Sequence, residues 1–368
     1  SCMQCGTCTA SCPQSRTGKF SPRHILRTLS LEKATDVTAD MAAWKCTTCN
    51  TCVETCPRGI QVKDLIRSIR QQTANTELVP ELIDEALDSL ENNRNPWQKK
   101  PEDRQNWHIK NHVEPFTTDH EYCLFTCCST TYANDNSPND KAGKALVDLL
   151  NLADVSYGSL KNQEGCCGDL AVNSGQEDLQ EKIATNNTDM FEQAGVQKLL
   201  TSSPHCLNAL KNSNEKIESS IQTEHYTELL SKQIKHGKLK PSKAIDKRVT
   251  FHDPCYLGRY NEIYDAPRNI IKSIPGLTLI EMQNNRTRSI CCGGGGGGIF
   301  KDNVTTSGNA TMRLEEAIQT GADTLVTACP HCLHVFDKTL KENNMQDKIK
   351  LQDLSELLHE SIDQKMAA

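Results

Sequence analysis

The chain has 368 residues, of which 36% are hydrophobic and 24% are charged, and its formal net charge is −6 at pH 7. This length allows two or three domains. The composition excludes a disordered tail and a polybasic nucleic-acid binder, so no nucleic acid is expected as a partner. No apolar run approaches the roughly 18–20 residues that span a bilayer. We therefore expect no transmembrane segment in this chain and any membrane attachment to come through a partner.

Nineteen cysteines are the unusual feature of the composition. A secreted disulfide scaffold usually has fewer than about 100 residues and follows a signal peptide. This chain is longer, and its cysteines fall in C-x-x-C runs and adjacent pairs. That pattern favours metal or cluster ligation in a reducing cytoplasm. Because the first motif cysteine is the second residue, we also expect further residues to precede Ser1 in the natural protein.

Two copies of one motif lie within the first 57 residues. Each copy reads C-x2-C-x2-C-x3-C-P, the run of bacterial two-cluster ferredoxins, in which the fourth cysteine ligates the other cluster. The alternative, two zinc knuckles, does not require this doubled pattern. The spacing predicts one [4Fe-4S] cubane on Cys2, Cys5, Cys8 and Cys56, and a second on Cys46, Cys49, Cys52 and Cys12.

A helix is expected after each motif. Ser21 is typical of a helix N-cap and Pro22 of the first helical residue, so one helix is expected to begin there. Apolar residues recur at helical spacing over residues 62–69 in the other. These helices complete a predicted ferredoxin-like domain at residues 1–75.

Residues 76–119 are predicted to form a helical linker. One amphipathic helix is expected around residues 77–90, followed by a polar stretch that contains Trp97 and Trp107. Two tryptophans argue against a free linker. We therefore expect this connector to pack against its neighbours.

From about residue 120 the sequence repeats itself weakly. The second copy has the spacing C-x35-CC-x36-C-x-x-C, and the first has C-x38-CC-x35-S-x-x-C, with Ser203 in place of one cysteine. The cysteines of the second copy are Cys255, Cys291, Cys292, Cys329 and Cys332. The cysteines of the first copy, counted from Cys127, are Cys127, Cys166, Cys167 and Cys206.

Strand and helix patterns alternate in both copies. β-rich segments end at most of the cysteine groups, at residues 124–126, 199–201, 249–252 and 324–327, and helical patterns such as residues 142–152 lie between them. This alternation predicts two α/β domains, residues 120–243 and 244–368, with cysteines gathered at the carboxyl ends of strands. The expected fold class is α+β, a helical two-cluster ferredoxin module followed by two repeated α/β domains.

The second copy resembles the CCG domain, the cysteine-rich domain of the B-type polypeptide of heterodisulfide reductase and of related flavoprotein-linked quinone reductases. Residues 44–58 resemble the C-type polypeptide of the same enzyme, so the chain resembles a C-type ferredoxin module fused to B-type CCG domains. In that family each complete motif holds a noncubane [4Fe-4S] cluster. The resemblance implies such a cluster, and the catalytic site, on Cys255, Cys291, Cys292, Cys329 and Cys332.

The first copy departs from the family pattern at Ser203, because a hydroxyl is a much poorer iron ligand than a thiolate. Three outcomes are open: a four-cysteine iron–sulfur cluster, a tetrahedral zinc site or a domain without metal. Cys128 could stand in for the missing ligand or replace Cys127, which would favour a cluster. Cys123 is expected to be a buried free thiol.

Six glycines, residues 293–298, follow the second cysteine pair. One interpretation is a flexible loop with a high entropy cost. The other is that the missing Cβ atoms let the N–H groups of Gly293 and Gly294 approach the cofactor. No G-x-x-x-x-G-K-[ST] motif is present. Three histidines near cysteines, His205, His252 and His331, are interpreted as hydrogen-bond donors or as plain structure.

The resemblance implies an iron–sulfur subunit of a heterodisulfide reductase-like oxidoreductase, which passes electrons through two cubanes to a noncubane cluster that reduces a small disulfide. The alternative is an electron-transfer subunit that links a flavoprotein dehydrogenase or electron-transfer flavoprotein to a membrane quinone or cytochrome b partner, without a substrate of its own. Because the chain has no flavin or haem motif, both interpretations need such partners. The expected location is the cytoplasm, or the inner face of the membrane through a partner.

Overall fold

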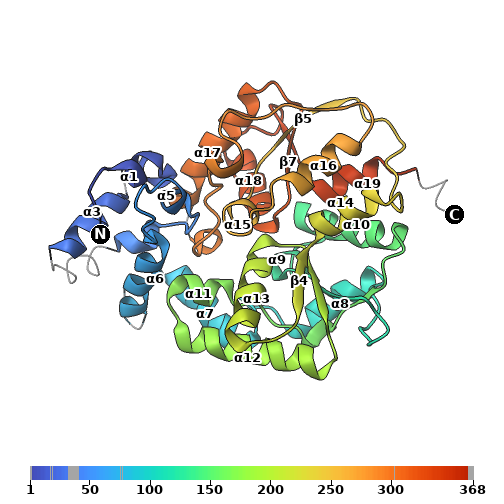
Figure 1. Cartoon of the computed structure of the whole chain (residues 1–368), viewed down its shortest axis with the longest axis horizontal. Coiled ribbons are helices and arrows are strands. Elements are labelled where there is room, and N and C mark those ends of the chain that lie inside the picture. Colours follow the sequence, from blue (N-terminus) through green and yellow to red (C-terminus); the bar gives the residue numbers. More distant parts are fainter. Residues whose placement is uncertain are drawn as a thin grey trace.

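The computed structural model describes residues 2–16, 18, 20–31, 41–74, 76, 78–301 and 303–363. The N-terminal helices lie at one end of the molecule, and two α/β domains lie beside each other next to them (Figure 1). No helix of the described residues is long and apolar enough to cross a membrane.

The N-terminal module consists of short helices around the cysteine loops. As predicted, the third helix begins at Pro22, and the Ser21 hydroxyl accepts a hydrogen bond of 3.2 Å from the backbone N–H of His24. Ile25, Leu26 and Ile66 form its small apolar core together with several cysteines. The elements are α1 (Thr7–Ser11), α2 (Pro13–Arg16), α3 (Pro22–Ser30), η1 (Ala42–Lys45), α5 (Thr51–Glu54) and α6 (Val62–Thr73).

The connector contains two helices, α7 (Glu81–Asn93) and α8 (Pro101–Lys110). Apolar residues of α7, among them Ile83 and Leu87, enter the core of the first α/β domain, and Trp107 is buried. The connector is therefore packed, as two tryptophans suggested. Asn75, the predicted domain limit, and Glu77, the predicted helix start, lie outside the described residues.

The first α/β domain is built on a four-stranded parallel sheet of order β2-β1-β3-β4. Its strands are β1 (Tyr122–Phe125), β2 (Tyr157–Gly158), β3 (Lys198–Thr201) and β4 (Gln222–His225). Its helices are α9 (Cys128–Thr131), α10 (Pro138–Leu152), η2 (Lys161–Gln163), α11 (Asp169–Ser174), α12 (Glu177–Gln193), α13 (Pro204–Ile217) and α14 (Tyr226–Lys235).

The second α/β domain repeats this topology with the order β6-β5-β7-β8, again all parallel. The repeated α/β architecture predicted from the sequence is thus confirmed. The strands are β5 (Lys247–Phe251), β6 (Leu277–Leu279), β7 (Thr324–Thr327) and β8 (Lys350–Asp353). The helices are α15 (Cys255–Gly258), α16 (Asp265–Ser273), η3 (Arg286–Arg288), η4 (Gly298–Phe300), α17 (Asn303–Gln319), α18 (Pro330–Glu342) and α19 (Leu354–Glu360).

One apolar core joins the two α/β domains. Helix α10 of the first domain packs against α19 of the second, and Leu149 and Leu358 belong to the same buried cluster. Two hydrogen bonds reinforce the contact: Tyr226 Oη donates to Asp353 Oδ1 at 2.8 Å, and Ser355 Oγ donates to the Ala142 carbonyl at 2.9 Å. This core fixes the cysteine-bearing edges of the two sheets relative to each other.

The N-terminal module docks on both domains where glycines leave room for its backbone. A Cβ on Gly175 of the first domain would lie 2.4 Å from the Gln71 nitrogen of α6. A Cβ on Gly296 of the second domain would lie 2.6 Å from the Cys46 carbonyl oxygen. Both distances are far below contact, so larger residues at these positions would push the module away.

We expect Gly175→Ala to lower thermal stability more than Gly237→Ala. Both glycines have positive φ, +74° and +72°, but a Cβ on Gly237 meets nothing nearer than 3.9 Å. The backbone cost is therefore about 1 kcal/mol in both variants, and the collision with α6 adds about 1–3 kcal/mol to Gly175→Ala only. Anaerobic thermal unfolding checks this. Equal losses of stability would show that the interface is looser than described.

Candidate iron–sulfur site

The second cubane site is the better enclosed of the two in the N-terminal module. Cys12 from the first motif lines one small cavity with the three second-motif cysteines Cys46, Cys49 and Cys52. Burial raises the pKa of Cys12 to about 12, with Cys49 and Cys46 adding to the rise. The structure thus brings together the four thiols that the crossed ferredoxin pattern groups.

The first cubane site lies nearer the surface. Cys8 is buried, whereas Cys5 is exposed and its thiol lies 3.3 Å from Thr7 Oγ1. The Cys2 thiol accepts a hydrogen bond of 3.4 Å from the Gln4 N–H, and the Cys56 thiol accepts one of 3.5 Å from the Ile60 N–H. The grouping of Cys56 with Cys2, Cys5 and Cys8 stays a prediction.

The five cysteines of the second α/β domain lie at the carboxyl end of its sheet. Cys255 begins α15 just after β5, and Cys329 caps α18 just after β7. Their thiols form a chain of interacting neighbours, and the Sγ atoms of Cys292 and Cys332 are 3.3 Å apart. In order, the chain runs Cys255, Cys291, Cys292, Cys332 and Cys329.

Backbone N–H groups of the glycine run point at two of these thiols. Gly293 donates to Cys291 Sγ at 3.3 Å, and Gly294 donates to Cys292 Sγ at 3.5 Å. These N–H groups therefore reach the thiols, and their approach to a cofactor stays a prediction. The next two glycines have another role, because Gly295 and Gly296 admit the backbone of Thr47 and Cys46. No signal in the sequence predicted this second role.

His252 is held in one orientation beside the same thiols. Arg313 Nε donates to His252 Nδ1 at 3.1 Å, so Nδ1 is an acceptor and the ring proton is on Nε2. A nitrogen of His252 and the sulfurs of Cys292 and Cys332 lie within 4.8 Å of one another. The neighbouring thiols of Cys291 and Cys332, and then the nearby His252, hold the pKa of Cys292 well below its usual value.

The first α/β domain brings five thiols together, not four. Each thiol interacts with the next in a closed ring, and all are buried in one cluster. Cys123, on β1, is buried apart from this ring. The Ser203 hydroxyl is buried and has no hydrogen-bond partner among the described residues. The ring runs Cys127, Cys128, Cys166, Cys167 and Cys206.

Buried cations near the thiols supply a test of whether an anionic cofactor fits. Arg70 is fully buried, and it donates hydrogen bonds to carbonyl oxygens, including one of 2.6 Å to Cys46. Arg259 is also buried, donates 2.7 Å to the Cys49 carbonyl, and keeps one nitrogen without a partner among the described residues. Lys301 donates to the carbonyl of Trp44. A buried cation is costly without an anion, and thiolate-bound iron–sulfur clusters satisfy that need.

The candidate sites are in contact one after another. Cys49 and Cys291 belong to one buried cluster. Their interaction lowers the pKa of Cys49 well below its usual value, and Thr47 Oγ1 lies 3.7 Å from Cys291 Sγ. On the other side, His205 of the first domain interacts with the Cys329 thiol. The His205 ring also lies 4.2 Å, between centroids, from the ring of His331. The second ferredoxin site, the second domain and the first domain therefore form a series.

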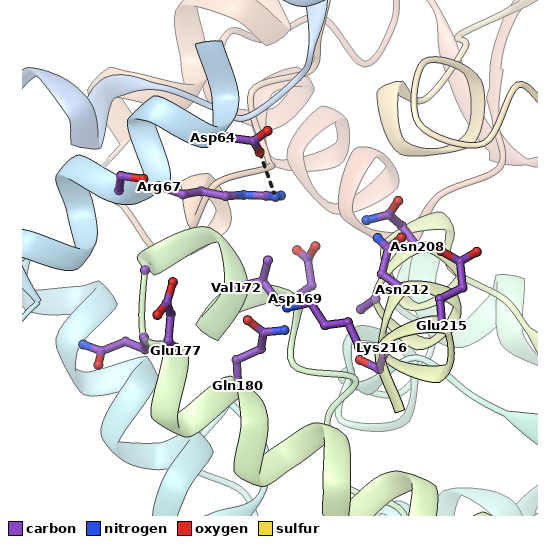
Figure 2. Close-up of a pocket in the computed structure, with 15 residues that line it drawn as sticks. Asp64, Arg67, Asp169, Val172, Glu177, Gln180, Asn208, Asn212, Glu215 and Lys216 are labelled. Carbon is purple, nitrogen blue, oxygen red and sulfur yellow. Dashed lines mark ion pairs between the residues drawn. The ribbon is translucent and has the colours of Figure 1, made fainter. Parts of the chain in front are cut away.

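Two cavities adjoin the series. A narrow one of about 30 Å³ lies between the thiols of the first domain and the glycine run, closed by Trp97 and Phe300. A wider polar groove of about 520 Å³ lies between α6 and the helices of the first domain (Figure 2). Asp169 lines this groove and holds His205 through a 2.9 Å contact, and Asp64 and Arg67 form an ion pair of 3.6 Å across its upper edge.

Comparison with protein families defines the class. Residues 1–60 match the 4Fe-4S dicluster domain, and residues 122–211 and 249–337 match the cysteine-rich domain CCG. The chain is therefore an iron–sulfur protein with one dicluster ferredoxin domain and two CCG domains. This agrees with the predicted fold class.

The particular family follows from a relative of similar length. The chain is 30% identical to the D-type polypeptide of the dihydromethanophenazine:CoB–CoM heterodisulfide reductase of Methanosarcina mazei, covering 98% of this chain and 93% of that protein. It belongs to the family of iron–sulfur oxidoreductases that contains this heterodisulfide reductase polypeptide, which confirms the resemblance stated from the sequence.

Other relatives are longer. The chain is 30% identical to the probable iron-sulfur-binding oxidoreductase FadF of Bacillus subtilis and 29% identical to the EtfAB:quinone oxidoreductase of Syntrophomonas wolfei. The matches cover 98% and 99% of this chain but only 59% and 58% of those proteins, so it spans about three fifths of their length. A crystal structure of a hypothetical protein from Helicobacter pylori shares the fold, with a TM-score of 0.56 at 12% identity, covering 95% of this chain and 70% of that one.

We expect Arg70→Met to weaken both the docking of the N-terminal module and its iron retention. The variant leaves buried carbonyls, among them that of Cys46, without donors, at a cost of about 3 kcal/mol or more. Arg248→Met is the control, because Arg248 is exposed and pairs with Asp323 at the surface. Iron content after gel filtration and the thermal midpoint measure the effect. An Arg70→Met protein as stable and iron-rich as the control would contradict it.

Proposed function

We propose that this chain is the iron–sulfur subunit of a heterodisulfide reductase-like oxidoreductase, in which electrons enter at the N-terminal module and reach a noncubane [4Fe-4S] cluster in the second CCG domain. The observation that carries the proposal is the contact of Cys49, a predicted cubane ligand, with Cys291, a predicted ligand of the next cluster. Ligands in contact leave a short path for an electron. When bound, the clusters supply one-electron transfer.

The chain's own residues would hold and adjust these centres. Cys255, Cys291, Cys292, Cys329 and Cys332 would ligate the noncubane cluster, and the N–H groups of Gly293 and Gly294 would stabilise its negative charge. Reduction of a disulfide consumes two electrons and two protons and releases two thiols. A flavoprotein partner would supply the electrons, since the chain itself has no flavin motif.

A second function, electron transfer between a flavoprotein and a membrane quinone or cytochrome b partner, has its own support. One relative is named EtfAB:quinone oxidoreductase. The match to that relative covers 99% of this chain.

A thiol-trapping experiment separates the two functions. The anaerobic protein is oxidised in the presence of a small thiol, such as 2-mercaptoethanesulfonate, and examined by electron paramagnetic resonance. A disulfide reductase is expected to give a new signal that broadens with thiol labelled with ³³S. The Cys291→Ser variant should lose the signal, and Cys123→Ser should keep it. Rapid reduction by a flavoprotein with no thiol-dependent signal would instead identify the conduit.

We expect His252→Phe to lower the midpoint potential of the centre in the second CCG domain. Arg313 orients the histidine so that its N–H lies near the Cys292 sulfur. If that N–H donates to the cluster-bound thiolate, its loss costs about 1–1.5 kcal/mol, which corresponds to about 40–60 mV for one electron. His252→Gln, which keeps a donor, should shift the potential less, and His359→Phe on α19 should not shift it. A redox titration followed by paramagnetic resonance measures this, and an unchanged potential in His252→Phe would exclude the donor role.

A further inference from the structure

Sheet register gives an alignment of the two CCG domains that is independent of cysteine spacing. Leu124 pairs with Leu200 in the first sheet, and Phe251 pairs with Val326 in the second. Residues Leu200 and Val326 correspond, because each lies three residues before the first residue of the S/C-P-H-C run. Leu124 therefore corresponds to Phe251.

This register changes which cysteines are equivalent. Cys128 follows Leu124 by four residues, as Cys255 follows Phe251, and the short helices α9 and α15 begin at these two cysteines. Cys127 then corresponds to Pro254, which immediately precedes α15. The register therefore favours Cys128, the alternative to Cys127, as the start of the first motif.

The order of the thiols agrees with the register. In the second domain the chain of contacts runs from Cys255 through the CC pair and Cys332 to Cys329. In the first domain it runs from Cys128 through the CC pair and Cys206, and then to Cys127. The neighbour of Cys206 is thus Cys127, whereas the corresponding neighbour of Cys332 is Cys329.

Cys127 also lies beside the position that has lost its cysteine. Its backbone N–H donates to Ser202 Oγ at 3.3 Å, next to Ser203, the counterpart of Cys329. The Ser203 hydroxyl is fully buried and has no partner among the described residues. The backbone of the β1–α9 turn, which carries Cys127, is therefore hydrogen-bonded to the loop that carries Ser203.

We propose that Cys127 replaces the thiolate that Ser203 lacks, so that the first CCG domain is a five-thiolate iron–sulfur site and not a zinc site. Tetrahedral zinc takes four ligands, and five buried thiols in one ring match the donor set of the second domain. The inference rests on the proposed function in one respect: it assumes that the five cysteines of the second CCG domain hold a cluster. The ligands are Cys127, Cys128, Cys166, Cys167 and Cys206.

The test exchanges the residues at positions 127 and 203. Iron and zinc are then measured in the full chain after anaerobic reconstitution. The unchanged protein should bind about 16 iron atoms and less than about 0.1 zinc per chain, four irons for each of four clusters. Cys127→Ser should lose about four of these irons. Cys127→Ser combined with Ser203→Cys should regain them, and Cys123→Ser, a buried cysteine on the same strand, should lose none.

The corresponding exchange in the second domain, at positions 329 and 254, provides an independent test if a first-domain variant fails to fold. Cys329→Ser alone should lose about four irons, and Cys329→Ser with Pro254→Cys should regain them. Zinc near one per unchanged chain, full iron in Cys127→Ser, or a folded Cys127→Ser/Ser203→Cys protein that stays low in iron would each overturn the proposal. A failure of the proposed function would give another result. In that case Cys291→Ser would keep all its iron, whereas the first-domain variants would still lose and regain iron as described.

Discussion

The contact between the cysteine loop at residues 46–50 and the glycine run at residues 293–297 is the constraint on which the rest of the structure depends. Thiols of two candidate clusters can touch only if two backbones approach without side chains between them. Gly295 and Gly296 provide that approach, since a Cβ on either would lie within 2.6 Å of a carbonyl oxygen of the cysteine loop. Cluster contact, domain docking and the composition of one loop thus have a single cause.

Buried charge follows from the same contact. The two backbones leave carbonyl oxygens facing inward, and Arg70 and Lys301 donate to them. Arg70 thereby brings positive charge close to the thiols. Arg259 does the same between Cys49 and the second CCG domain. Such cations are expensive in a protein interior unless anions accompany them. Their positions therefore make sense only together with thiolates and the negatively charged clusters that thiolates bind.

The sequence predicted the elements with strong local signals. The Ser21 cap, the central strands β1, β3, β5 and β7, and the gathering of cysteines at strand ends all follow from spacing and apolar periodicity. The edge strands were not predicted, since β2 has only two residues and β6 has three. Arg70 and Asp169 were missed because no motif marks them. Their roles come from partners distant in sequence, such as Asn173 for Arg70 and His205 for Asp169.

The first CCG domain shows why a cysteine motif and a cluster site are different things. A motif counts residues along the chain, whereas a cluster needs sulfur atoms at given places in space. In a parallel sheet the loops after neighbouring strands converge at one edge, so a thiol on the loop after β1 can occupy the place of one on the loop after β3. Cys127 and Ser202, the neighbour of Ser203, are 75 residues apart in the chain, yet they are hydrogen-bonded at that edge. A motif that looks broken in the sequence can therefore describe a complete site, because the fold allows the missing ligand to come from another strand.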